Sequence, residues 1–128
     1  MATGIVWAEI PVLDMNRAVA FYNAVFRLQA EVYDDGERLS AVLWMIEGAP
    51  GCSLTQTAGF RPSADGVWIY LHSEDPLDEL LARVEAAGGE ILTPHTSMGE
   101  AGSYTAIRDT EGNTLALYTA PVGAPTTS

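Results

Sequence analysis

Cysteine is almost absent from this sequence. Cys52 is the single one, so the chain cannot form an internal disulfide or a metal site built from several cysteines. There is also no apolar run of about 18 residues, which a membrane-spanning helix needs. The first residues lack the basic, apolar and small segments of a signal peptide. We therefore expect a protein of the reducing cytoplasm that does not contact a membrane.

Basic residues are scarce as well. The chain has 6 Lys and Arg against 17 Asp and Glu, and its formal net charge is −11. Nucleic-acid binding needs clustered basic residues to neutralise phosphates, so this composition excludes a nucleic-acid partner. The negative charge favours solubility, and it also favours a cationic small molecule over an anionic one.

The first part of the chain predicts a strand followed by a helix. Residues 4–10 are β-prone and end at Pro11. Alternation puts Ile5, Trp7 and Glu9 on one face and Val6, Ala8 and Ile10 on the other. Asp14 is a suitable N-cap, and the residues at helical spacing after it are apolar: Ala18, Phe21, Tyr22, Val25 and Phe26. We expect this helix to cover the Val6 face and leave Trp7 and Glu9 uncovered.

The remaining elements repeat this order. Strands are predicted around 30–33, 39–46 and 52–57, and after a linker at 58–66 a strand spans 67–72. A helix then starts at Pro76 and ends at Gly88 and Gly89. Three strands follow, around 90–94, 103–107 and 114–119. The sequence thus predicts one α+β domain of two βαβββ modules, at 4–57 and 67–120, with a loose tail at 121–128. The uncovered sheet faces of two modules, in one chain or in two, should enclose a cavity.

The last two strands form a predicted hairpin at 104–118. Its turn is Asp109-Thr110-Glu111-Gly112-Asn113, in which Asp and Asn can bond to nearby backbone and Gly can take a positive φ.

This hairpin, the first-helix motif Asp14-Met15-Asn16-Arg17-Ala18-Val19-Ala20-Phe21-Tyr22 and the duplicated modules resemble the vicinal oxygen chelate superfamily. That family includes glyoxalase I, the bleomycin and fosfomycin resistance proteins and the extradiol dioxygenases. The resemblance implies two curved sheets that form a cup, often at a homodimer interface. In one respect the chain departs from the family: Arg27 follows the first helix, where relatives commonly have a glycine.

The resemblance also implies where a divalent metal would bind. The family's ligands come from the first and last strands of each module, and the corresponding positions here are Trp7, Ser53, Ile69 and Ala116. None is a good ligand for such an ion, and among their neighbours only Cys52 could coordinate one. We therefore predict that the chain has no metal site and no cofactor.

Other side chains could use the cup instead. Candidate ligand-binding residues are Trp7, Trp44, Ser53, Arg61, Ile69, Ala116 and Tyr118, and Trp68 is an aromatic residue of the same kind. Glu9 is the candidate general base, because an apolar cavity would raise its pKa, and Tyr104 or His95 could act as the acid.

The leading hypothesis is a protein that binds a small, largely apolar or cationic molecule without a metal, in the manner of the drug-sequestering resistance proteins. One alternative is a metal-independent isomerase, lyase or cyclase that uses Glu9. Another is a metal-dependent glyoxalase-type lyase or dioxygenase with unusual ligands. By resemblance we expect a homodimer.

Overall fold

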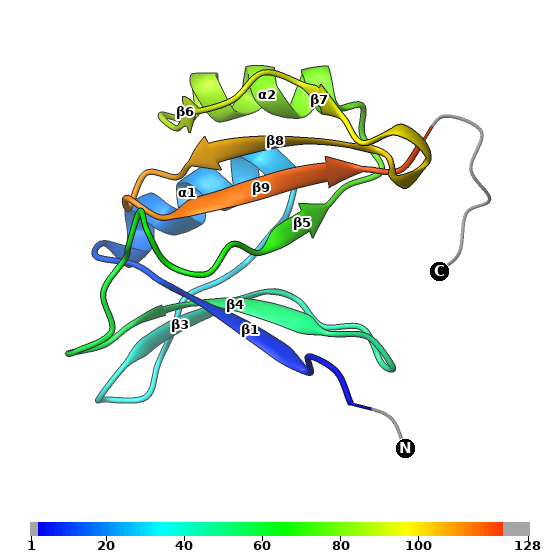
Figure 1. Cartoon of the computed structure of the whole chain (residues 1–128). Coiled ribbons are helices and arrows are strands. Elements are labelled where there is room, and N and C mark those ends of the chain that lie inside the picture. The colour runs from blue at the N-terminus through cyan, green and yellow to red at the C-terminus, as the bar shows by residue number, and fades with distance from the viewer. Residues whose placement is uncertain (1–2, 122–128) are drawn as a thin grey trace.

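A computed structural model describes residues 3–121 of the chain. It contains two mixed β-sheets and two α-helices, which confirms the predicted α+β class. In Figure 1 the sheet with β5, β8 and β9 lies above the sheet with β1, β3 and β4. Helix α1 contacts α2 as well as β3 and β4, so the two modules share one hydrophobic core. No helix in the described part of the chain is long and apolar enough to span a membrane.

The first module has the predicted order of elements. These are β1 (Trp7–Pro11), α1 (Met15–Phe26), β2 (Tyr33–Asp34), β3 (Leu39–Trp44) and β4 (Gly51–Gln56). The sheet order is β1-β4-β3-β2, with β1 parallel to β4 and the other pairs antiparallel. The parallel pair needs a long crossover, and α1 lies within it.

The second module repeats this plan. Its elements are β5 (Tyr70–His72), α2 (Leu77–Ala86), β6 (Glu90–Ile91), β7 (Thr96–Ser97), the short 3-10 helix η1 (Gly99–Ala101), β8 (Ser103–Arg108) and β9 (Thr114–Thr119). The sheet order is β5-β9-β8-β6, with β7 also paired to β8. Strand β5 is parallel to β9, as β1 is to β4.

Several predicted boundaries shift in the structure. The expected strand at 67–72 is paired only from Tyr70, and the expected strand at 30–33 is reduced to Tyr33–Asp34. Strand β7 and helix η1 were not predicted. Of the predicted tail, 122–128 lies outside the described residues. Propensity identifies residues that can form a strand, but pairing requires a neighbouring strand in register.

The buried face of α1 follows the predicted period, and the Asp14 side chain caps the helix by accepting a hydrogen bond from the Arg17 amide at 3.1 Å. Ile10 on β1 is buried beneath the helix and Ala8 is half-buried. Val6 precedes β1 and is exposed. The prediction that the helix covers this whole face was therefore wrong for Val6, because the strand begins only at Trp7, three residues later than predicted.

Arg27 ends α1 in the left-handed conformation, with φ 55° and ψ 48°. Its amide donates to the Asn23 carbonyl. The turn is therefore built in the way that a glycine would allow, although a side chain is present. Among the described residues, Arg27 is the only one other than glycine with a positive φ, and a Cβ in this region costs free energy.

The predicted hairpin turn at 109–113 joins the two modules. Its Glu111 carboxylate accepts hydrogen bonds from the amides of Leu13 and Asp14, both at 2.8 Å. The same carboxylate forms an ion pair with Arg17, whose Nε lies 2.7 Å from Glu111 Oε2. The Glu111 side chain is fully buried. A negative charge at this place also interacts favourably with the dipole of α1. We call this set of contacts the Glu111 clasp.

The same turn reaches the middle of α1 and the end of β1. The buried Tyr22 hydroxyl donates to Asp109 Oδ2 at 2.7 Å, and the Asn113 side chain donates to the Pro11 carbonyl at 2.8 Å. Burial, followed by the nearby Asp109 charge, raises the pKa of Tyr22 well above its ordinary value. Gly112 has φ 99°, as the turn prediction required.

We predict that Arg27→Gly stabilises the protein by about 0.5–1 kcal/mol, because glycine removes the strain of the left-handed conformation. The measurement is the free energy of unfolding in urea. Arg27→Ala is the matched control, since it shortens the side chain but keeps the Cβ. A glycine variant no more stable than the alanine variant would contradict the prediction.

We predict that Glu111→Gln lowers the free energy of unfolding by about 2 kcal/mol at neutral pH, because charge-assisted hydrogen bonds at a buried site are lost. Glu31→Gln, at an exposed loop residue, should change it by less than about 0.5 kcal/mol. Urea titrations of the three proteins measure both effects.

The clasp also has a pH dependence. Burial alone would raise the pKa of Glu111, but bonds from Arg17, the Asp14 and Leu13 amides and Thr110 lower it overall. A lowered folded pKa contributes stability above the unfolded value of about 4.3, and this contribution is lost as the pH falls through the folded pKa. The difference between the parent protein and Glu111→Gln should therefore shrink below about pH 4. An unchanged difference would contradict this assignment.

Candidate functional site

The face of the first sheet that α1 leaves uncovered carries the predicted site residues of β1 and β4. Trp7, Glu9, Ser53 and Thr55 point to this face, because they alternate with core residues such as Ile10, Cys52 and Leu54. Trp7 pairs with Gly51, and Glu9 pairs with Ser53. The alternation read from the sequence is therefore confirmed for Trp7 and Glu9.

Trp7 is held against the neighbouring strand. Its indole Nε1 donates to Ser53 Oγ at 3.0 Å, and 37% of the residue remains exposed. Ser53 itself is buried. Trp7 and Ser53 occupy two of the four positions that hold metal ligands in the family the chain resembles. Here the two side chains are hydrogen-bonded to each other.

Glu9 is part of an ion pair. Its Oε1 accepts from Arg38 Nη2 at 2.7 Å and from Thr55 Oγ1 at 3.2 Å. Both charged side chains are partly open to solvent, with 40% of Arg38 and 43% of Glu9 exposed. The Glu9 carboxylate is therefore paired with a cation and partly open to solvent. Arg38 was not predicted, because nothing local in the sequence shows that the β2–β3 turn brings it beside β1.

The uncovered face of the second sheet is aromatic. Register places Tyr70, Ala116 and Ala106 in one row and His72, Tyr118 and Tyr104 in the next. The Tyr70 and Tyr104 rings are 5.9 Å apart, and the His72 and Tyr118 rings are 6.1 Å apart. Tyr70 was missed as a site residue, because alternation from the expected position Ile69 puts it on the other face, and only the pairing with Ala116 shows its place.

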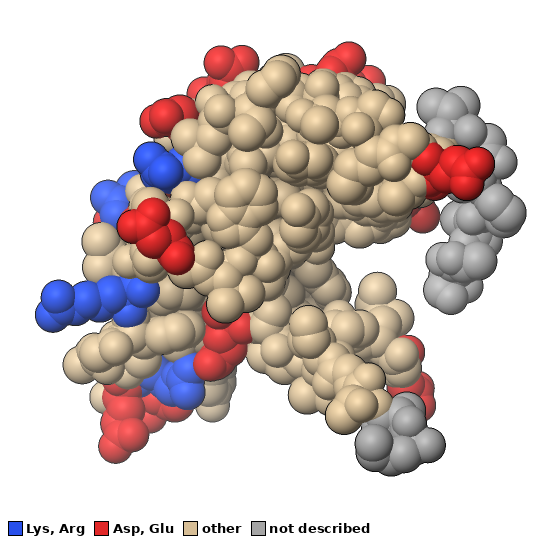
Figure 2. All heavy atoms as spheres, viewed as in Figure 1, with Lys and Arg blue, Asp and Glu red and all other residues tan. Residues whose placement is uncertain are grey.

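A groove of about 490 Å³ runs between the two modules. One wall is β1, including Trp7 and Glu9, and the other includes Val67, Ile69 and Leu115. Figure 2 shows a notch between the part of the surface that contains β5 and β9 and the part that contains β1, β3 and β4. The side chains around this notch are mostly neither acidic nor basic. Glu9 and Arg61 are the charged residues among those that line the groove.

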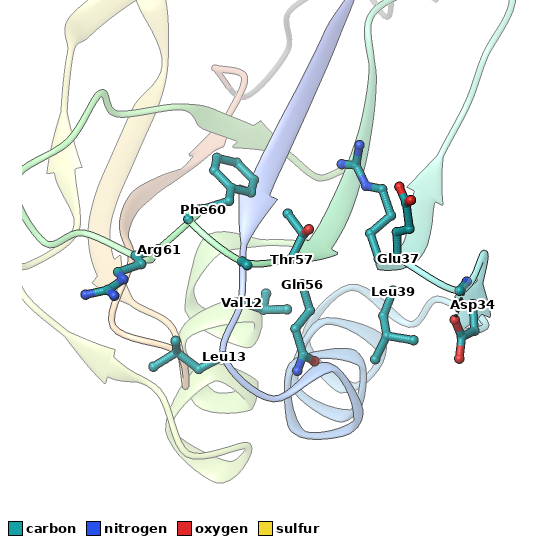
Figure 3. Close-up of a pocket in the computed structure, with 13 residues that line it drawn as sticks. Val12, Leu13, Asp34, Glu37, Leu39, Gln56, Thr57, Phe60 and Arg61 are labelled. Carbon is teal, nitrogen blue, oxygen red and sulfur yellow. Dashed lines mark hydrogen bonds between the residues drawn. The ribbon is translucent and has the colours of Figure 1, made fainter.

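A second pocket of about 570 Å³ lies at the end of β4 and of β1 (Figure 3). Its lining includes Gln56 and Arg38, and Arg61 and Asp34 lie at opposite ends in this view. Phe60 and Arg61 line both this pocket and the groove, so the two spaces adjoin. Arg61, a predicted contact residue, therefore borders both spaces.

Some predicted residues lie elsewhere. A bulge in β3 pairs Trp44 with Cys52, so Trp44 packs against the core. Ala116 is completely buried and does not line the groove. His95 Nδ1 lies 3.4 Å from Asp78 on α2, on the helix-covered side of the second sheet, whereas Tyr104 is on its uncovered side. Tyr118 donates its hydroxyl to the Ala101 carbonyl at 2.5 Å. The structure thus brings together Trp7, Glu9, Ser53, Arg61 and Ile69, and separates His95 from them.

The residues at the four metal-ligand positions do not fit a divalent ion. The indole of Trp7 and the side chains of Ile69 and Ala116 have no lone pair for a metal, and the Ser53 hydroxyl accepts from Trp7. Burial raises the pKa of the neighbouring Cys52 thiol to about 12, so it is not a thiolate at neutral pH. Within residues 3–121 no three His, Cys, Asp or Glu side chains cluster as metal ligands.

Comparison with known proteins agrees with this fold. The sequence model of the Glyoxalase/Bleomycin resistance protein/Dioxygenase superfamily matches residues 4–117. Among curated proteins, the chain is 25% identical over 130 residues to the putative glyoxylase CFP32 of Mycobacterium tuberculosis. That alignment covers 89% of this chain and 44% of the relative, so the chain spans less than half of the relative's length.

Solved structures show the same architecture. The chain is similar to a glyoxylase/bleomycin resistance protein/dioxygenase domain from Frankia sp. EAN1pec, with a TM-score of 0.71, 18% identity and coverage of 94% of this chain and 100% of that one. It is also similar to the fosfomycin resistance protein FosX from Listeria monocytogenes, with a TM-score of 0.68, 17% identity and coverage of 95% and 97%. At such identities the likeness shows the fold alone.

Proposed function

Because the chain belongs to the Glyoxalase/Bleomycin resistance protein/Dioxygenase superfamily, we propose that it binds a small, planar, largely apolar molecule in the groove, without a metal ion. The observation that carries this proposal is the exposed indole of Trp7, which stands at a metal-ligand position and is hydrogen-bonded to Ser53 at another. An aromatic face of this kind binds a flat ring by stacking.

The charges at the groove favour a neutral molecule over a cationic one. Glu9 is the acid that lines the groove, and Arg38 pairs with it. Arg61 adds a positive charge at the boundary with the second pocket. The net charge of −11 is therefore a property of the whole surface, and it does not describe the groove.

We also propose that the chain forms a homodimer through the surface around the groove. Several large apolar side chains are exposed, and two of them, Ile5 and Val67, line the groove. The others are Val6, Val42, Met45, Ile46, Trp68, Tyr70 and Met98. Val67 is 91% exposed and Val6 is 82% exposed. Exposed apolar side chains in this number favour an interface, and a second copy on this side would close the groove and shield a bound ring from water.

The binding proposal predicts saturable binding of naphthalene, a flat apolar probe, measured by titration calorimetry. Trp7→Ala should weaken it by about tenfold or more, because ring stacking and apolar burial are lost. Tyr33→Ala is the matched control, since Tyr33 is an exposed aromatic residue on β2 outside the groove. If naphthalene bound the parent and the Trp7→Ala protein with equal affinity, the proposed function would be contradicted.

The dimer proposal predicts a mass of about twice the 13.7 kDa of one chain, measured by light scattering after gel filtration. The double variant Val6→Asp/Val67→Asp should give the monomer mass, because buried unpaired charges disfavour association. The control is Val32→Asp, at an exposed apolar residue near β2. A parent protein that is monomeric at every concentration would contradict the prediction.

A further inference from the structure

The Trp7 indole lies along β4 and covers two of its residues. At one end, Nε1 bonds to Ser53. At the other end, the six-membered ring occupies the space above Gly51, where a Cβ would lie 2.4 Å from Cζ3 and 2.7 Å from Cε3. Gly51 and Ser53 are two apart on one strand, so their side-chain positions are on the same face. The ring is therefore seated on the sheet, and 37% of the residue remains exposed.

This seat orients the indole before a ligand arrives. Gly51 provides the space and Ser53 fixes the rotation of the ring, so both act as positioning residues for Trp7. A side chain that is already fixed loses little conformational entropy on binding. A ring seated in this way selects flat ligands.

A polar group lies beside the seat. Glu9 follows Trp7 by two residues on the same face of β1, roughly 6–7 Å away at about 3.3 Å per residue. Glu9 and Arg38 meet through one contact, in which Nη2 donates to Oε1. In the described chain Glu9 Oε2 accepts no hydrogen bond, and Arg38 makes no other one with its guanidinium. The pair thus offers an open acceptor next to open donors.

The position of this pair connects the two spaces. Glu9 lines the groove and Arg38 lines the adjoining pocket. A ring stacked on Trp7 would therefore present one edge to both groups. The complementary edge has an N–H for the carboxylate and, next to it, a carbonyl for the guanidinium.

We infer that the ligand is a planar ring amide, a heterocycle with adjacent N–H and C=O groups, which stacks on Trp7 and bonds to the Glu9–Arg38 pair. This inference rests on the proposed binding function and names its chemical class. Hydrogen bonds to charged groups are stronger than those between neutral groups. The N–H and C=O edge of the ligand should therefore decide which ring is selected, whereas stacking on the indole should contribute affinity for any flat ring.

The test uses three probes of similar shape with the parent protein: carbostyril, a flat bicyclic lactam; its N-methyl derivative; and naphthalene. Titration calorimetry should give carbostyril at least about tenfold tighter binding than either of the other two, since each lacks the lactam N–H and a good charged hydrogen bond corresponds to about that ratio. Equal affinities for carbostyril and its N-methyl derivative would overturn the inference.

Variants of Glu9 and Arg38 test whether these two residues cause the tighter binding of carbostyril. Glu9→Met and Arg38→Met should each weaken the binding of carbostyril by about tenfold. The affinity for naphthalene should stay within about twofold, because these variants remove only the hydrogen bonds to the lactam edge. Glu31→Met, at an exposed acid outside the groove, should change neither. A loss of both probes to the same degree in Glu9→Met would contradict the role of the ion pair.

The seat has its own readout. In a Trp44→Phe/Trp68→Phe background Trp7 is the single tryptophan, because the sequence has three. Ser53→Ala should lower the fluorescence anisotropy of Trp7 and weaken the binding of carbostyril and of naphthalene to the same degree. Ser53→Thr keeps a hydroxyl and should therefore preserve both the anisotropy and the affinities. Unchanged anisotropy in Ser53→Ala would contradict the positioning role.

The two proposals fail separately. If naphthalene binds through Trp7 but carbostyril binds no tighter, the ring-amide inference is wrong and the binding function stands. If no probe shows binding that depends on Trp7, the binding function itself is wrong.

Discussion

The buried carboxylate of Glu111 organises the contact between the two modules. It belongs to the last hairpin, but its partners are the amides that precede α1 and the guanidinium of Arg17. A buried carboxylate is costly unless its oxygens are well bonded, and here every contact crosses from the second module to the first, apart from the neighbouring Thr110 hydroxyl. The cost of burial therefore makes the arrangement specific, because any other docking of the modules would leave this charge unpaired.

The hairpin also shapes the groove. Asn113 lines the groove, bonds to the Pro11 carbonyl at the end of β1 and bonds to Asp109 in its own turn. It accepts from the Ser63 amide in the linker as well. The turn thus ties the end of β1 to the linker, and Trp7 and Arg61, which lie on these two segments, both line the groove. The hairpin motif therefore holds the modules together, and its residue Asn113 also lines the groove.

In the first sheet, Trp7 and Ser53 stand at two positions that correspond by resemblance to metal ligands of the family. In place of two ligands that point to a common ion, Trp7 and Ser53 satisfy each other through one hydrogen bond. Gly51 leaves the space that the larger indole requires. The remaining two positions hold Ile69 and the fully buried Ala116. The result is an aromatic ring held by Ser53 beside the Glu9–Arg38 ion pair, and the proposed binding of a flat molecule depends on this arrangement.

Local patterns in the sequence determined the duplicated modules, the cap at Asp14, the hairpin turn and the faces of Trp7 and Glu9. Each of these depends on periodicity or on a few neighbouring residues, which is why all of them could be predicted. Only the tertiary structure decided that Arg38 neutralises Glu9, that a bulge turns Trp44 to the core and that His95 lies beside α2. These depend on which distant segments meet, and a contact between segments far apart in the sequence leaves no local signal.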